Sequence, residues 1–251
     1  MKTLNLILFV IIMQGQLYSQ NISGIIIYKK DMQKRYQAVS KKFEKYRKTR
    51  PQFFNTVMDM ESKAYLLAKE VNFYLKFKDN ESIFKAENLL EIKNDISYGL
   101  VLGPEGSGTY YNNNKNKESI TQLDAYGELF LIKNESLKWK LINETKKIGK
   151  YICYKATTAK ITNGSKGEIK YPVIAWYVPA IPVHFGPLGF CGLPGIILKL
   201  DIYNMSYIAT KIELNPTKKI KIKKPIHGKV VTKKEFDEIG VGTMKNFKKG
   251  F

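Results

Sequence analysis

The period of the hydrophobic positions changes along the chain, and each change marks a different kind of element. A short β-branched run at residues 24–30 predicts a strand. Apolar residues then recur every three or four positions up to residue 71, a spacing that places them on one face of a helix. Pro51 interrupts this pattern where a new helix would begin, so we predict two helices, over about 32–48 and about 51–69.

From residue 71 to about 226, short β-branched and aromatic runs alternate with turn residues, a pattern that is typical of antiparallel strands. The pair Asp79-Asn80 and the segment TNGSKG at 162–167 predict hairpin turns. The glycine-rich segment 103–108 and the asparagine-rich segment 112–117 predict loops.

The last third of the chain carries two further signals. Residues 217–234 alternate lysine and isoleucine, which a strand would separate into a cationic face and an apolar face. Such a strand either protects a sheet edge from pairing, which we favour, or binds an anionic ligand. Thr232 and Glu235 have the spacing of a capping box, so we predict a short helix over about 232–248.

These elements predict an α+β fold of mostly antiparallel strands. We expect a twisted meandering sheet or a half-open barrel, with an N-terminal helical pair and a short C-terminal helix packed on its concave or open face. We expect one domain over 20–251. It would contain a helical insertion at about 31–70, a β-rich body at about 71–226 and the C-terminal helix.

The first nineteen residues have the pattern of a secretory signal peptide. Lys2 precedes an apolar core at 4–13, and the small residue Ser19 marks the expected cleavage site. A membrane anchor is the alternative, but this core is shorter than the roughly 20 residues that span a bilayer. No later apolar run has that length, so we expect a mature chain without a transmembrane segment. The protein would be periplasmic, associated with the outer envelope, or extracellular.

Charge is the unusual part of the composition. The chain has 42 basic and 22 acidic residues, a formal net charge of +20, and only three of the basic residues are arginine. Because arginine reads guanine and phosphate through paired hydrogen bonds, a lysine-dominated surface argues against specific nucleic-acid recognition. It fits surface solvation, which we favour, or generic attraction to anionic surfaces. The dense basic run at 41–50 is interpreted as the solvated face of the helical pair.

Residues that carry catalysis are few. The two histidines, His184 and His227, lie outside any GxSxG setting, so a hydrolase is an alternative that the sequence does not favour. A metal-dependent enzyme would need these histidines with Cys153 and Cys191, and none of the four has the paired local spacing of metal ligands. No segment has the form of a phosphate-binding loop, so we expect no cofactor. In an exported protein the cysteines form either a disulfide, which we favour, or two free buried thiols.

One group of segments carries a more specific signal. The segment FGPLGFCGLPGIIL at 185–198 follows AWYVPAIPV at 175–183, and KKIGKYICYKATT lies upstream at 146–158. Together they resemble the GLPGLI family, secreted proteins of Bacteroidetes type whose function is uncharacterised. The family name matches the core of the motif: Gly192, Leu193, Pro194, Gly195 and Ile196. The resemblance implies no reaction and no catalytic residue.

The Gly-Leu-Pro-Gly element predicts an ordered tight turn. Pro194 fixes its own φ, while Gly192 and Gly195 take positive φ or allow two backbones to approach closely. Cys191 adjoins this element and Cys153 lies in another of the resembling segments, so the resemblance makes a disulfide between them more attractive.

The candidate ligand-contacting residues are aromatic side chains near this turn: Trp176, Tyr177, Phe185 and Phe190. We expect a non-enzymatic binding protein of the bacterial cell envelope, whose apolar inner face holds a lipid, a peptide or another amphiphile. The alternative is a structural or accessory protein that docks an envelope protein through a sheet edge or its basic face.

Overall fold

The computed structural model describes residues 22–89, 95–164 and 167–249 of the chain, with side chains described up to residue 243. The predicted signal peptide at 1–19 lies outside these residues. Within them, no helix combines the length and the apolar character that crossing a bilayer requires.

A twelve-stranded sheet forms the body of the molecule, and it is not closed into a barrel. Its strand order is β12-β6-β5-β4-β3-β2-β1-β11-β10-β9-β8-β7. The described strand pairs are antiparallel except β12 with β6, which run parallel. This arrangement confirms the predicted α+β fold with a mostly antiparallel, meandering sheet. The strands are β1 (Ser23–Asp31), β2 (Phe73–Lys78), β3 (Glu81–Ala86), β4 (Thr109–Asn113), β5 (Glu118–Ala125), β6 (Glu128–Lys133), β7 (Lys140–Ile148), β8 (Tyr151–Gly164), β9 (Gly167–Val178), β10 (Ile196–Ile202), β11 (Met205–Leu214) and β12 (Lys229–Thr232).

Both predicted hairpins are present in the sheet. Between β2 and β3, Lys78 pairs with Glu81, and Asp79 takes the positive φ of 54° that the turn requires. Between β8 and β9, Gly164 lies opposite Gly167 within the TNGSKG segment. The turn residues in the sequence therefore located these two hairpins correctly.

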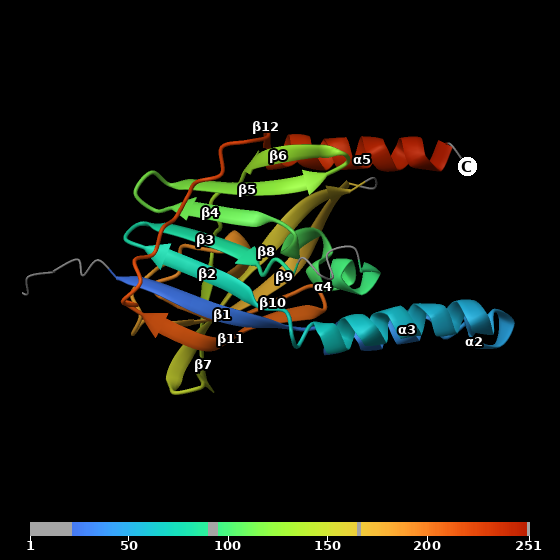
Figure 1. The fold of residues 1–251 in the computed structure, drawn as a ribbon, viewed down its shortest axis with the longest axis horizontal. Helices are drawn as coiled ribbons and strands as arrows, with labels where there is room; N and C mark the ends of the chain where they lie inside the picture. The colour runs from blue at the N-terminus through green and yellow to red at the C-terminus, as the bar shows by residue number, and fades with distance from the viewer. Residues whose placement is uncertain (1–21, 90–94, 165–166, 250–251) are drawn as a thin grey trace, which may run out of the picture.

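The sheet curves around its own inner face. In Figure 1, β8, β9 and β10 lie behind β2 to β6. The Tyr28 hydroxyl of β1 donates to the Ile197 carbonyl of β10 at 2.6 Å. The 3-10 helix η2 (Pro187–Gly189), in the connection from β9 to β10, contacts β3, β4 and β5. The main hydrophobic core fills the space inside this curve.

The helices α1 (Gln33–Phe43), α2 (Tyr46–Thr49) and α3 (Pro51–Leu67) form a helical arm, defined as residues 33–67. The predicted pair of helices is confirmed, with Pro51 in the first turn of α3. The arm extends away from one end of the sheet instead of lying on its face (Figure 1). The reason is that the apolar stripes of α1 and α3 face each other, as in the ring contact of Tyr36 with Tyr65 at 5.8 Å.

The predicted loop at 103–108 is wrong, because α4 (Ile96–Gly106) includes most of it. Asp95 caps this helix by accepting a hydrogen bond from the Ser97 amide at 2.6 Å. Gly103 has a non-helical conformation, with a φ of 59°, so two helical stretches meet at a kink just before Pro104. Glycine and proline favour a loop in the sequence, whereas the structure buries Val101 before the kink and Gly106 after it, with helix on both sides.

The lysine–isoleucine segment is also not the strand that its alternation predicts. Residues 215–228 form an extended strap that runs past the strand ends from β11 to β12 (Figure 1). Ile220 is buried, and the Lys224 ammonium pairs with Glu118 at 2.6 Å. Because the strap crosses the strands instead of running along one, its backbone forms no ladder, and only β12 pairs with the sheet.

The C-terminal helix α5 (Lys233–Lys249) has 17 residues and begins at the predicted capping box. Glu235 accepts from the Thr232 amide at 2.7 Å, and the Glu235 amide donates to the Thr232 hydroxyl at 3.2 Å. Phe236 packs on Phe130 of β6 at 5.3 Å between ring centroids. The helix also contacts β8, so it links the two sides of the open sheet.

Candidate functional site

The Gly-Leu-Pro-Gly element is an ordered turn, and its two glycines are required for different reasons. Gly192 has a φ of 91° and open space where a Cβ would lie. Gly195 has a φ of 153°, and a Cβ there would lie 2.3 Å from the Val178 carbonyl oxygen. Positive φ at Gly192 and close backbone approach at Gly195 are the two roles that the sequence predicted.

Hydrogen bonds close this turn on the segment that precedes it. The Gly192 amide donates to the His184 carbonyl at 3.0 Å, and the Ile196 amide donates to the Ile181 carbonyl at 3.1 Å. The His184 Nδ1 atom lies 2.7 Å from the Leu193 carbonyl oxygen. His184 therefore holds the turn through its ring as well as its backbone.

Three side chains from distant strands and loops fix the same segment to the body of the protein. Trp139 donates from Nε1 to the Cys191 carbonyl at 2.8 Å, and Asn112 donates to the Gly189 carbonyl at 3.3 Å. Tyr28 holds the start of β10 in the same way, as described above. The family-like motif is thus a structural connection that crosses the inner face of the sheet.

The candidate ligand-contacting residues lie largely in the core. Phe185 is 1% exposed, Phe190 5% and Tyr177 6%. Trp176 is half-buried, and the ammonium groups of Lys146 and Lys155 lie over its ring at 5.6 and 5.9 Å. A ligand on the inner face would have to displace well-packed aromatic rings, so this face is not an open apolar concavity in the structure.

The predicted disulfide is not present, because Cys153 and Cys191 are both free thiols. Cys153 is fully buried in β8, and burial raises the pKa of its thiol to about 11. Burial also raises the pKa of the Cys191 thiol. Both sulfurs are therefore protonated near neutral pH and behave as small hydrophobic groups, which is the alternative that the sequence left open.

In the structure both histidines lie in connecting segments and form hydrogen bonds there. The side chain of His184 holds the turn, and the carbonyl of His227 accepts a hydrogen bond from Gln122 at 2.8 Å. Across the part of the chain that the structure describes, no three histidine, cysteine or acidic side chains are grouped as metal ligands.

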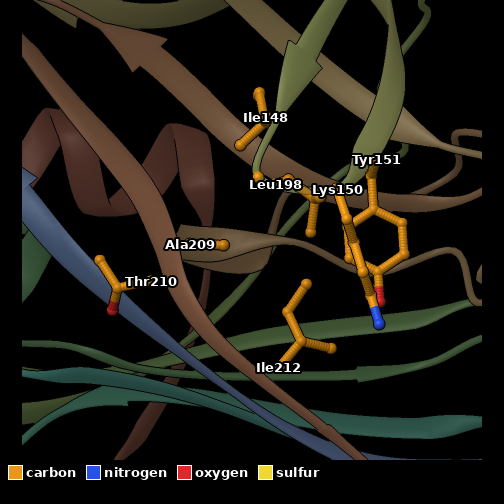
Figure 2. Close-up of a pocket in the computed structure, with 8 residues that line it drawn as sticks. Ile148, Lys150, Tyr151, Leu198, Ala209, Thr210 and Ile212 are labelled. Atoms are coloured by element: carbon orange, nitrogen blue, oxygen red, sulfur yellow. The ribbon is translucent and has the colours of Figure 1, made fainter.

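A pocket of about 210 Å³ lies beside the turn that joins β7 to β8 (Figure 2). Its lining combines that turn with residues of β10 and β11: Ile148, Gly149, Lys150, Tyr151, Leu198, Ala209, Thr210 and Ile212. Figure 2 shows Ile148, Leu198 and Ile212 around the hollow. Lys150 and Tyr151 lie side by side, with their polar ends directed the same way.

A two-residue turn between β7 and β8 supplies the polar side of this pocket. Ile148 pairs with Tyr151, so Gly149 and Lys150 form a two-residue hairpin turn. Gly149 takes a φ of 55°, and glycine with positive φ in the first turn position is typical of a type II′ hairpin. The Lys150 ammonium lies 5.5 Å from the centre of the Tyr151 ring, so a cation and a hydroxyl share the rim of a pocket lined by both polar and apolar groups.

Sequence reasoning missed this pocket. The sequence pattern places Gly149 in one continuous β-rich run, although an isolated glycine in a strand pattern is a signal for a bulge or turn. That signal would have found the hairpin. It would not have found the partners on β10 and β11, because these lie about fifty to sixty residues further along the chain.

A second polar cluster lies beneath α4. Lys30 of β1 is 2% exposed, and its ammonium donates to the carbonyls of Val101 and Leu102 at 2.7 and 3.2 Å. Burial lowers the pKa of Lys30 to about 8, although nearby Glu105 opposes the shift. These bonds join the central strand to the carbonyls just before the kink in α4.

Glu105 extends this cluster towards β8 and β11. Its carboxylate accepts from the Lys160 ammonium at 3.1 Å and from the Tyr203 hydroxyl at 3.0 Å. Burial alone would raise the pKa of Glu105, but the charge and hydrogen bond of Lys160 and the Tyr203 hydroxyl together lower it. The buried Tyr207 hydroxyl has no hydrogen-bond partner among the described residues.

Comparisons with known proteins locate similarity in the motif region. The model of a family described as "Protein of unknown function (Porph_ging)" matches residues 162–199. This short region contains the Gly-Leu-Pro-Gly element and the aromatic residues near it, and it supports similarity to an uncharacterised family; the GLPGLI name is not confirmed. No curated protein matches the chain.

Two solved structures were also compared. "Structure of PNGF-II in C2 space group" has 16% identity and a TM-score of 0.46, and the match covers 88% of this chain and 32% of that one. "Structure of PNGF-II in P21 space group" has 15% identity and a TM-score of 0.43, with 87% and 32% covered. The chain therefore spans about a third of the length of these two proteins.

Proposed function

We propose that this protein is an exported, non-enzymatic binding protein of GLPGLI type, and that it binds an amphiphile in the pocket beside the β7–β8 turn. The ligand would combine a small apolar group with an anionic group. The observation that carries the proposal is the composition of the pocket, which combines apolar side chains such as Ile148 and Ile212 with a lysine at its rim.

The size of the pocket limits the ligand. Pockets that enclose small molecules usually have volumes of about 300–1,000 Å³. A pocket of about 210 Å³ accommodates only part of a ligand, such as the end of a short acyl chain or one apolar side chain of a peptide. The anionic group would remain at the surface beside Lys150, where the pairing is worth at most about 1 kcal/mol.

Nuclear magnetic resonance of isoleucine methyl groups tests this proposal directly, because Ile148 and Ile212 both line the pocket. We expect octanoate to shift the methyl signals of these two residues, and octanol, which lacks the charge, to bind about two- to fivefold more weakly. Acetyl-leucine is the matched probe for a peptide source. Saturation by acetyl-leucine but not octanoate would identify a peptide, and the reverse would identify a lipid.

Two kinds of variant test separately how the Lys150 charge and the apolar part of the pocket contribute to binding. Lys150→Gln should reduce octanoate binding to the level of octanol, whereas Lys147→Gln, an exposed residue of the same hairpin outside the pocket, should not. Ala209→Leu should abolish binding of both probes by filling the hollow, with the methyl spectrum reporting that the fold is kept. Signals that do not shift with any of the three probes would overturn the proposal.

The alternative function, docking of an envelope protein at a sheet edge, is supported by the position of β7. Within the described residues β7 pairs with β8 alone, and most of its residues are exposed. A partner strand would protect the amides of residues 140–148 from hydrogen exchange. Protection by a purified partner confined to these amides would favour docking, and protection of residues 148–151 and 209–212 alone would favour the pocket.

A further inference from the structure

The outer end of the helical arm carries a combination of side chains that the amphiphile pocket does not use. We define the arm tip as residues 41–54, which include α2 and the ends of α1 and α3 that adjoin it. Figure 1 shows this end of the arm projecting away from the sheet. The tip therefore meets other surfaces before the rest of this side of the molecule does.

Three aromatic rings gather at the arm tip. Phe43, Tyr46 and Phe53 contact one another, with ring centroids separated by 5.4 to 6.0 Å. They do not belong to the main core, and Phe53 is 46% exposed. The sequence pattern assigned these rings to the buried face of a helix docked on the sheet, but the arm leaves them at its free end.

Cations surround the rings. The segment KKFEKYRKTR at 41–50 holds six basic residues and one acidic residue, Glu44, which pairs with Arg47 at 2.8 Å. The ammonium groups of Lys42 and Lys45 lie 5.6 and 4.8 Å from the centres of the neighbouring Phe43 and Tyr46 rings. The basic residues of this segment are exposed, so the tip presents a cationic rim around an aromatic centre.

From this geometry we infer that the arm tip docks on the surface of an anionic lipid bilayer. Aromatic rings are favoured at the boundary between headgroups and acyl chains. Each lysine or arginine near an anionic bilayer contributes about 1 kcal/mol to binding. At the arm tip this attraction adds to the insertion of the aromatic rings. A convex tip cannot enclose a small ligand, but it matches a flat surface that accepts rings and charges together.

The tip would insert only its rings, because no helix in the described chain has the length and apolar character to cross a bilayer. The docking is peripheral and reversible, since it depends on a few rings and on charges that salt screens. It is independent of the amphiphile pocket, which lies at the β7–β8 turn and shares no residue with the tip.

A fluorescent probe at the tip tests insertion. The chain has two tryptophans, Trp139 and Trp176, and both lie outside the arm, so Phe53→Trp adds a reporter at the tip. We expect its emission to shift to the blue with phosphatidylcholine–phosphatidylglycerol vesicles, at about three to one, and not with phosphatidylcholine alone. Brominated lipid should quench the added tryptophan, and the unsubstituted protein provides the background signal.

Charge variants test the cationic rim. Lys41→Gln combined with Lys48→Gln removes two exposed charges while keeping all three rings. We expect it to weaken vesicle binding about twenty-fivefold, at roughly fivefold for each charge. The matched control is Lys218→Gln with Lys221→Gln on the strap, which changes the net charge equally and should weaken binding less than twofold. Replacing Lys41 and Lys48 with arginine should keep full binding.

Two outcomes would overturn the inference. The first is equal loss of binding in the tip and strap variants, because the attraction would then arise from net charge alone. The second is an unshifted and unquenched Phe53→Trp signal on vesicles that bind the protein. Phe53→Ser should reduce binding about tenfold, and circular dichroism then distinguishes loss of the ring from unfolding of the arm.

Discussion

At the scale of single residues, several positions are determined by their immediate surroundings and not by their chemistry as functional groups. Gly195 lies so close to Val178 that no side chain fits. Cys153 and Cys191 pack as hydrophobic groups. Lys30 is the opposite case, because a charged group lies in the core and is stabilised by carbonyls of α4.

The two glycines of the motif give a matched prediction. Gly195→Ala should lower the unfolding free energy by about 3–5 kcal/mol, because the new Cβ would meet the Val178 carbonyl and the backbone φ disfavours a side chain. Gly192→Ala should cost only about 1–2 kcal/mol, since space is open there and φ alone is unfavourable. Chemical denaturation of the two variants measures the difference, and equal losses would contradict the steric explanation.

Lys30 predicts a dependence of stability on pH. Its pKa is about 8 in the folded protein and about 10.5 in the unfolded chain, so the unfolded state binds more protons between these values. The unfolding free energy should therefore rise with pH above 8, by up to about 1.4 kcal/mol per pH unit from this group.

The variant Lys30→Met removes this titration, so the comparison isolates it from the other titrating groups. Denaturation of both proteins at pH 7.5, 8.5 and 9.5, from about half a unit below the folded pKa to about one and a half units above it, should give a steeper rise for the unsubstituted protein. If stability depends on pH equally in the two proteins, the pKa of Lys30 is not lowered in the folded state.

At the scale of elements, the periodic pattern and the turn residues were reliable where an element depends on local interactions. The helices of the arm, the hairpins at 79–80 and 162–167 and the start of α5 all follow from them. The errors at α4 and at the strap have one cause. In both segments packing against distant residues overrides local propensity, so helical structure resumes after the kink at Gly103 and an alternating segment remains unpaired.

The capping box of α5 gives the prediction at this scale. Thr232→Ala should destabilise the protein by about 1 kcal/mol, because the Glu235 amide loses its acceptor. Thr56→Ala is the control: its hydroxyl bonds back to Gln52 within α3 and caps nothing, so the change should stay within about 0.5 kcal/mol. Thermal unfolding followed by circular dichroism compares them, and an equal effect would argue against the cap.

At the scale of the whole molecule, an open sheet is held in its curved form by elements that connect its distant parts. The motif connection crosses the inner face, and α5 joins β6 to the far end of β8. The Asp237 carboxylate of α5 accepts from the Asn163 amide of β8 at 3.0 Å and also pairs with Lys233. Because core side chains fill the inner face, we place the ligand site at the β7–β8 turn instead.

The contact between α5 and β8 predicts a local change in hydrogen exchange. Asp237→Ala should speed exchange of the Asn163 amide about tenfold, because a charged acceptor contributes about 1.5 kcal/mol or more to such a bond. Glu238→Ala, at the next and exposed position of α5, should leave that amide unchanged. Equal exchange in both variants would show that α5 does not hold this end of the hairpin.

The sequence by itself determined the kinds of elements, the positions of several turns and the backbone conformations of the Gly-Leu-Pro-Gly motif, because these depend on residues close together in the chain. Only the tertiary structure decided that the aromatic residues Phe185, Phe190 and Tyr177 pack in the core and that the two cysteines remain free. It also brought residues 148–151 to Leu198 and Ile212. Such contacts arise from the curvature of the whole sheet, which no local pattern encodes.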